Sequence, residues 1–342
     1  MAPRDDFQPS LFEEPLDGHE QFMQEAARLR AALPPTLRFG TSSWTYPGWS
    51  GMVYRRSYPK TGATVEMLAE YARCPLFRTV GVDSFFYRPP TPEVLEEYRH
   101  ALPPDFPLVM KVWDQVTSYA LNSPRHHMLR QMGVVQTHPS GRNPDWLNPA
   151  LCVDAVIGPT VEHLGEHAGV FLFEFETIPR SAGLDAAAFA EQLDRFFGAL
   201  PVGPRYAVEI RTPQHLKAPY FAALRAHRVA HVFSSWTHMP AIGAQLLHAD
   251  ALTADFTVAR ALLRPGRTYT DAVEAFSPYD RIQDAFPEGH DDILTLIDRA
   301  LAHATTVFVI ANNRFEGSSP LTITNLARRF LLRDSEPFIF RT

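Results

Sequence analysis

The chain has 342 residues, of which 45% are hydrophobic and 20% are charged, and its formal net charge is -6. This length suits one large domain, and no apolar run reaches the roughly 20 residues that a membrane-spanning helix needs. The composition excludes a disordered polyelectrolyte, and the negative charge argues against a generally basic nucleic-acid surface. A local basic groove is still compatible with that total.

The N-terminal residues indicate the cellular location of the protein, and the cysteines indicate whether it has disulfides or a zinc site. Residues 1–15 are acidic and polar, without the basic start and apolar core of a secretory signal, so we expect a cytoplasmic protein. Cys74 and Cys152 are the only cysteines, and their separation predicts neither a disulfide framework nor a cysteine zinc site. The sequence has no glycine-rich phosphate loop and no Gly-x-Ser-x-Gly elbow. It therefore indicates no nucleotide or metal cofactor.

Two segments precede the main domain, and we assign them to residues 1–35. Residues 1–20 have no periodicity and are expected to form a flexible tail. The apolar spacing of Phe22–Leu33 predicts a leading helix, which two prolines end.

In residues 36–342, short apolar runs alternate with helical patterns. The predicted strands are Leu37–Ser42, Arg78–Ser84, Leu108–Trp113, Val170–Glu176, Tyr206–Arg211, Val229–Ser235, Phe256–Ala261 and Thr306–Ala311. The predicted helices include Thr64–Arg73, Pro92–Ala101, Leu184–Ala199, Asp291–Ala302 and Leu321–Arg333. Several strands are continuous Val, Phe and Ile runs, which is typical of parallel strands covered by helices. Eight such strands favour a closed barrel over an open sheet, so the sequence predicts an α/β protein with a single TIM-type (β/α)8 barrel.

A long stretch after the third strand, residues 119–157, fits neither pattern and is rich in proline and histidine. It leaves the carboxyl end of a barrel strand, where loops enclose the sites of barrel enzymes. We interpret this insertion as a lid. A floppy insertion fits the same loop statistics equally well.

Motifs spread along the chain resemble those of a known family. They are RFGTSSWTYPGWSGMVY (residues 38–54), VDSFFYRPPTPEV (82–94), VMKV (109–112), LFEFE (172–176), YAVEIR (206–211) and ANNRFEG (311–317). In this order they resemble the DUF72 (YecE-like) family of uncharacterised TIM-barrel proteins. The specificity comes from their ordered occurrence rather than from any one motif.

The chain also departs from that family's pattern. The family's fourth-strand glutamine is Glu174 here, and the prolines after it are Glu176 and Thr177. The seventh-strand Arg-Leu-His-Gly reads Arg-Ala-Leu-Leu over 260–263, so the family histidine is missing. The resemblance therefore implies no mechanism that depends on this histidine.

Polar residues that end apolar strands are the candidates for chemistry, because barrel enzymes carry their reactive groups there. Glu174 and Glu209 are the predicted acid–base carboxylates, with Lys111 as their partner, since burial and like charge push carboxylate pKa values apart. Period-two geometry puts Glu209 and Arg211 on one strand face. The alternative is an internal network in which Glu209, Arg211 and Lys111 neutralise one another and brace the barrel. The residues expected to bind substrate are Ser42, Trp44, Tyr46, Asp83, Tyr87, Trp113, Arg211, Arg260, Asn312 and Asn313.

Several candidates have a structural alternative. Asn312 and Asn313 suit a turn after a strand as well as a substrate oxygen. The aromatic residues could stack on a sugar or nucleobase, or only floor the cavity. Residues 163–167 read His-Leu-Gly-Glu-His, a zinc-protease pattern, but Gly165 interrupts the helix that this motif needs, so we reject this motif and name no metal ligands. A metal held by the scattered residues Asp83, Glu174, Glu209 and His238 is compatible with the sequence but not indicated by it.

These observations predict an enzyme of hydrolase, lyase or isomerase type that uses acid–base chemistry on a small polar, phosphorylated or sugar-like substrate. Two alternatives stay open. QPSLF, from Gln8 to Phe12, resembles the peptide that docks bacterial proteins on the DNA sliding clamp, with Leu11 and Phe12 filling an apolar groove. It suggests a nucleic-acid-processing or repair-associated protein. The other alternative is a non-catalytic ligand-binding barrel.

Overall fold

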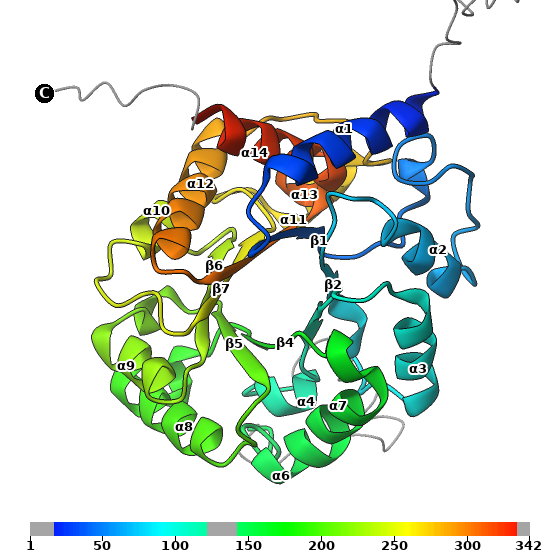
Figure 1. Ribbon diagram of the computed structural model, residues 1–342. Coiled ribbons are helices and arrows are strands. Elements are labelled where there is room, and N and C mark those ends of the chain that lie inside the picture. Colours follow the sequence, from blue (N-terminus) through cyan, green and yellow to red (C-terminus); the bar gives the residue numbers. More distant parts are fainter. Residues whose placement is uncertain (1–16, 122–141, 334–342) are drawn as a thin grey trace, which may run out of the picture.

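The computed structural model describes residues 17–121 and 142–333, and its centre is a barrel of eight parallel strands. Figure 1 looks along the barrel, with the strands at the centre and the helices around them. Hydrogen-bonded neighbours follow the order β1-β8-β7-β6-β5-β4-β3-β2. The strands are β1 (Leu37–Thr41), β2 (Val80–Val82), β3 (Leu108–Lys111), β4 (Val170–Phe175), β5 (Arg205–Ile210), β6 (Ala230–Ser235), β7 (Phe256–Ala261) and β8 (Thr306–Ala311).

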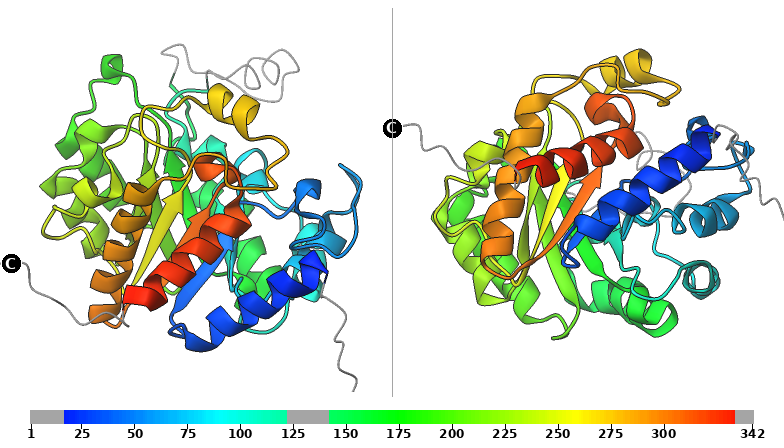
Figure 2. Two further views of the ribbon diagram at one scale, coloured as in Figure 1. Left: turned by 90° about the horizontal axis from the view of Figure 1, so that it is seen from above. Right: turned by 45° about the horizontal axis from the view of Figure 1, so that its top comes forward.

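The helices form the outer layer that covers the strands. Figure 2 shows α1 and α14 side by side along one flank, and α11 beyond the arrowhead ends of the strands. The helices are α1 (Gly18–Ala32), α2 (Thr64–Tyr71), α3 (Pro92–Ala101), α4 (Asp114–Thr117), α6 (Pro149–Cys152), α7 (Gly158–Leu164), α8 (Ala186–Gly198), α9 (Ala218–Ala226), α10 (Ile242–Gln245), α11 (Tyr269–Phe276), α12 (Pro287–Ala302), α13 (Asn313–Glu316) and α14 (Ser319–Arg333).

The strands separate two apolar layers, because successive side chains point to opposite faces. Alternate residues of β4, such as Phe171 and Phe173, join the large core under the helices. The residues between them face the barrel interior and form a second cluster: Val109, Val170, Leu172, Ala207, Ala230, Val232, Phe256, Val258, Phe308 and Ile310. Burial on both faces explains why the strands read as continuous apolar runs.

The barrel closes between β1 and β2 through a close backbone approach rather than a full ladder. Phe39 bridges Phe77, and the Arg78 amide donates to the Phe39 carbonyl at 2.9 Å. Gly40 makes this approach possible, because a Cβ atom there would lie 2.1 Å from the Thr79 carbonyl oxygen. The missing side chain of one glycine therefore permits closure.

The predicted barrel is confirmed, and the bounds of β7 and β8 agree with the prediction, whereas β2 and β3 are shorter than predicted. After Val82 the chain enters a 3-10 turn, η2 (Asp83–Phe86), so Asp83 and Ser84 belong to this turn and not to the strand. Trp113 likewise lies beyond β3, at the N-terminal cap of α4. Both corrections move polar candidates from strands into the loops at the barrel mouth.

The leading helix begins earlier than predicted, at Gly18, because the Asp17 side chain accepts a hydrogen bond from the Glu20 amide at 2.8 Å. Its buried residues Ala26 and Leu29 belong to the main core, and the helix packs against α14. It is therefore part of the barrel's outer layer. The flexible tail predicted before it lies mostly outside the described residues.

The second half of the insertion over residues 119–157, for which a lid is predicted, is helical in the structure. Residues 149–164 are continuously helical, through α6, a π-helical turn over 153–157 and α7, and Cys152 and Ile157 are buried in the core. These residues cover the barrel wall because their apolar side chains pack on it. Residues 122–141 lie outside the described part of the chain.

Among the residues that the structure describes, no helix is both long enough and apolar enough to span a bilayer.

The seam between β1 and β2 yields a stability prediction. Gly40→Ala should lower the free energy of unfolding by about 2 kcal/mol or more, since the methyl group collides with backbone rather than with a mobile side chain. Urea denaturation measures this loss. Gly198→Ala is the matched control, because its methyl meets only the tip of the His227 ring at 3.3 Å and alanine favours a helix. Equal effects in both variants would refute the role of Gly40 in closure.

Candidate active site at the barrel mouth

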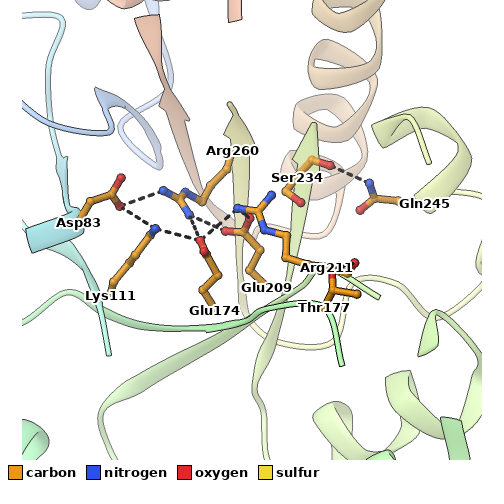
Figure 3. A network of polar contacts seen from close by, with 9 residues as sticks. All are labelled: Asp83, Lys111, Glu174, Thr177, Glu209, Arg211, Ser234, Gln245 and Arg260. Carbon is orange, nitrogen blue, oxygen red and sulfur yellow. Dashed lines mark hydrogen bonds and ion pairs between the residues drawn. The ribbon is translucent and has the colours of Figure 1, made fainter. Parts of the chain in front are cut away.

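The inward face of the strands changes from apolar to charged at the carboxyl ends. On four strands the last inward apolar residue is followed, two positions later, by an ionisable side chain: Lys111 after Val109, Glu174 after Leu172, Glu209 after Ala207 and Arg260 after Val258. Period-two alternation places these charged groups directly above the apolar interior. They meet in one network, which Figure 3 shows from close by.

Arg260 is the central cation of this network and reaches three carboxylates. Its Nη1 atom donates to Glu209 Oε2 at 2.6 Å and to Glu174 Oε2 at 3.1 Å, while Nη2 donates to Asp83 Oδ1 at 3.0 Å. Its side chain is only 3% exposed. The guanidinium of β7 therefore ties together the ends of β2, β4 and β5.

The other two cations of the network, Lys111 and Arg211, also contact Glu174 Oε2, the oxygen that accepts from Arg260. Lys111 Nζ lies 2.9 Å and Arg211 Nη2 3.1 Å from Glu174 Oε2, and Lys111 also approaches Asp83 Oδ1 at 3.6 Å. Arg211 pairs in addition with Glu209 Oε1 at 2.5 Å. The network thus joins three carboxylates to three cations, and its formal charges sum to zero.

The electrostatic surroundings fix the charge states of several members. Burial would raise the pKa of Glu174, but the Lys111, Arg211 and Arg260 cations outweigh it and hold the pKa well below its ordinary value. For Lys111, burial lowers the pKa, yet the Asp83 and Glu174 carboxylates raise it above its ordinary value. Glu174 is therefore a carboxylate and Lys111 an ammonium near neutral pH.

The members of the network differ in how much of each side chain is exposed to solvent. The Glu209 side chain has no exposed surface, whereas the side chains of Glu174 and Lys111 are 11% and 13% exposed. Asp83 is the most open at 31%. A substrate entering from the mouth can reach Asp83 and the tips of Lys111 and Glu174, but it cannot reach Glu209.

A cavity of 530 Å³ opens beside Asp83, between the loops that follow β1 and β2. Its walls combine apolar faces with hydroxyl groups. They include Trp44, Val65, Val94, Tyr98, Ser43, Thr45, Thr91, Arg88 and Glu97 as well as Asp83. Asp83 is the network residue that also lines this cavity.

Rings flank the cations of the network. The Arg211 guanidinium lies 3.9 Å from the centre of the Trp236 ring, and Lys111 Nζ lies 5.0 Å from that of Phe86. The sequence analysis did not select Trp236, although it directly follows the sixth predicted strand. The same position-based argument that selected Trp113 could have found it.

The remaining predicted substrate residues lie around the network rather than in it. The Ser42 hydroxyl donates to the Ala311 carbonyl at 3.3 Å, and Trp44 Nε1 donates to the Thr64 carbonyl at 2.8 Å. Tyr87 is 54% exposed, and Trp113 is half-buried against the core. Tyr46 packs against the Trp49 and Tyr279 rings.

The two asparagines after β8 act locally. The Asn312 side chain accepts from the Arg314 amide at 3.0 Å and caps α13, and Asn313 Oδ1 accepts from both the amide and the hydroxyl of Ser319 at 2.8 Å. These bonds fit the turn interpretation, since asparagine side chains satisfy backbone groups at helix starts.

The structure shows where the residues that depart from the family motif lie. Glu176 follows the end of β4 and is exposed. Leu262 and Leu263, where the family pattern continues after Arg260, are buried in a small apolar cluster with Phe276. Hydrophobic packing thus fills the region in which the family has its histidine.

The described residues hold no cluster of three or more His, Cys, Asp or Glu side chains arranged to bind a metal ion. The two histidines of the zinc-protease pattern have separate partners. His163 contacts the Glu96 carboxylate at 3.0 Å, and His167 contacts the Phe106 carbonyl at 3.1 Å. The clamp-like segment from Gln8 to Phe12 falls outside the described residues, so the docking hypothesis for Leu11 and Phe12 stays a prediction.

The fold and the charged mouth define a TIM-type barrel protein. Residues 38–338 match the model of DUF72, a protein family of unknown function, and the chain belongs to that family. A solved DUF72 family protein from Thermotoga maritima is 18% identical with a TM-score of 0.53, over 88% of this chain and 99% of that one. Another from Enterococcus faecalis is 13% identical with a TM-score of 0.56, over 88% and 96%. No curated protein matches the chain.

The network yields a prediction that tests its bracing role. Glu209→Gln removes a fully buried negative charge and leaves Arg211 and Arg260 short of a counter-charge, so the free energy of unfolding should fall by about 3 kcal/mol or more. Glu191→Gln, which breaks an exposed pair with Arg195, should change it by only about 0.5 kcal/mol. Urea denaturation compares the two. An unaltered stability in Glu209→Gln would show that the network does not brace the barrel.

The pKa of Glu174 leads to a prediction of pH dependence. Because its folded-state pKa lies below the ordinary 4.5, Glu174 stabilises the fold above that pH, and the stabilisation is lost as the pH falls through the folded-state pKa. The difference in unfolding free energy between wild type and Glu174→Gln should therefore be largest above pH 4.5 and shrink in acid. Exposed Glu162→Gln should show little difference at any pH. A pH-independent gap for Glu174→Gln would contradict the assignment.

Proposed function

We propose that this DUF72 protein is an enzyme that uses Asp83 as its acid–base group on a small polar substrate bound at the barrel mouth. One observation carries the proposal: Asp83 belongs both to the ion-pair network and to the 530 Å³ cavity. Lys111 and Arg260 hold its Oδ1 atom. Its Oδ2 atom has no ion-pair or hydrogen-bond partner among the described residues.

This arrangement favours Asp83 over the carboxylates that the sequence suggested. Glu209 is sealed beneath the two arginines, so we regard it as a positioning residue. Glu174 accepts three cations on one oxygen, and its lowered pKa makes it a poor proton carrier near neutral pH. Asp83 combines a fixed orientation with an open oxygen, which a general base requires.

Lys111 supports the proposed chemistry without exchanging a proton itself. Its raised pKa keeps it as an ammonium, and its partly exposed tip lies at the boundary between the network and solvent. A fixed cation in this position stabilises negative charge that develops on the substrate when Asp83 removes a proton. The network holds the cation in place before the reaction, so little reorganisation is needed.

The cavity supports a small polar or sugar-like substrate. Its volume lies within the ~300–1,000 Å³ that is usual for small-molecule sites. Trp44, Tyr98 and Val94 offer apolar faces, while Ser43 and Thr45 add hydroxyl groups. Aromatic faces beside hydrogen-bonding groups suit a ring that carries hydroxyls.

Substrate-directed profiling tests the proposal. The purified full chain is incubated with a metabolite extract, and mass spectrometry records which compounds are consumed and formed. We expect wild type to convert at least one small polar compound and Asp83→Asn to lose about 100-fold or more of that rate, because the amide cannot accept the proton.

Asp250→Asn is the matched control, since it makes the same change in an exposed aspartate that pairs with Arg225. It should convert the compound at the wild-type rate. Asp83→Asn must also keep a wild-type circular dichroism spectrum. Conversion by Asp83→Asn at the wild-type rate would refute the proposal, and compounds that are bound but not converted by wild type would favour the non-catalytic binding barrel.

A further inference from the structure

Arg314 is a cation at the barrel mouth that the network does not include. It follows β8, in α13, and its guanidinium carbon lies 4.4 Å from the centre of the Tyr269 ring. Over residues 17–121 and 142–333, no carboxylate comes within ion-pair distance of it. Stacking uses the face of the guanidinium and leaves its in-plane N–H groups free to donate.

Tyr46 and Tyr279 pack on each other at the same mouth, and with Arg314 and Tyr269 they form what we call the arginine–tyrosine rim. The Tyr46 and Tyr279 rings are 5.5 Å apart. Burial raises the pKa of Tyr46, the Arg314 cation opposes this rise, and the Asp83 carboxylate adds to it. The Tyr46 phenol therefore lies within electrostatic range of both Arg314 and Asp83.

The phenols of the rim are available as donors. Neither Tyr46 nor Tyr279 has a hydrogen-bond partner for its hydroxyl within the described ranges. The raised pKa keeps the Tyr46 phenol protonated at neutral pH, so that it can donate a hydrogen bond.

Backbone packing fixes the rim in place. A Cβ atom on Gly48 would lie 2.2 Å from the Pro278 carbonyl oxygen, so the loop after β1 is tight against the segment that carries Tyr279. On the other side, the Gln283 amide donates to the Glu316 carbonyl at 2.8 Å. Gly317, with a φ of 119°, accommodates this segment against the end of α13.

Charge decides what this rim can attract. The neighbouring network contains three carboxylates and three cations, so it offers no surplus charge to a ligand. Arg314 adds one positive charge that no neighbouring carboxylate offsets. A guanidinium beside phenol hydroxyls is a donor set for a phosphate or carboxylate group.

We propose that Arg314, with the hydroxyls of Tyr46 and Tyr279, binds the anionic group of the substrate, a phosphate or a carboxylate. This inference rests on the proposed function, since it assigns to the same mouth a substrate whose anionic end lies at the rim while Asp83 acts on another part. It narrows the substrate class to small organic anions. It also identifies Arg314 as a binding residue that the sequence analysis did not select.

Anion titration tests the inference without knowledge of the substrate. Inorganic phosphate and, in a parallel arm, acetate are titrated into the full chain, and calorimetry records saturable binding. We expect wild type to bind at least one of the two anions, Arg314→Gln to lose about tenfold or more in affinity, and Arg314→Lys to be intermediate, because lysine keeps the charge but not the planar donors. The preferred anion distinguishes a phosphate from a carboxylate substrate.

Two further variants separate this inference from the proposed function. Arg225→Gln, in an exposed ion pair, should bind the anion as wild type does. Glu174→Gln should bind it at least as tightly, because it removes a negative charge nearby, whatever its effect on turnover. Equal affinities of wild type and Arg314→Gln, or no saturable binding of either anion to wild type, would overturn the inference even if Asp83 proves catalytic.

Discussion

The structure depends on the balance of charge at the top of the barrel interior. Ionised groups are costly to bury unless each has a partner, and removing one partner from a buried pair typically costs about 3–5 kcal/mol. Here three cations face three carboxylates, and Arg260 alone reaches three strand ends across the barrel. Each buried charge of this network has a counter-charge. The network can therefore form the boundary between the apolar interior of the barrel and the solvent at its mouth.

The same balance divides the charged residues into two kinds. Glu209 and Arg260 are sealed and hold the strand ends at a fixed spacing, whereas the Asp83 side chain is partly exposed and lines a cavity. The catalysis proposed at the edge of this charged layer would meet the general need for charged groups that are oriented before the substrate arrives. Arg314 lies outside the balance, and its surplus charge gives the mouth a preference for anions. Membership of the DUF72 family says nothing about the reaction, because a fold does not define a function. The chemistry proposed for this chain rests on Asp83 and Arg314.

Much of this site could be predicted from strand periodicity. Alternation alone placed Glu209 and Arg211 on one face, and the strand order brought Lys111 and Glu174 to the same end. Periodicity carries no information on depth, so it could not show that Glu209 is sealed while Asp83 is open. The turn that begins at Asp83 was not predicted, because Asp83 and Ser84 follow the apolar run of the strand directly. Arg314 was missed because its ring partner, Tyr269, lies on α11, 45 residues earlier, which no local pattern can reveal.

A neutron crystal structure near neutral pH tests the central claim most directly, because it shows the protons of the network. The claim is that Glu174 and Lys111 are both ionised, so that their pair braces the mouth rather than exchanging protons. We predict no deuterium on either carboxylate oxygen of Glu174 and a complete ammonium on Lys111, as their shifted pKa values imply. Deuterium on Glu174, or a neutral amine at Lys111, would contradict the account.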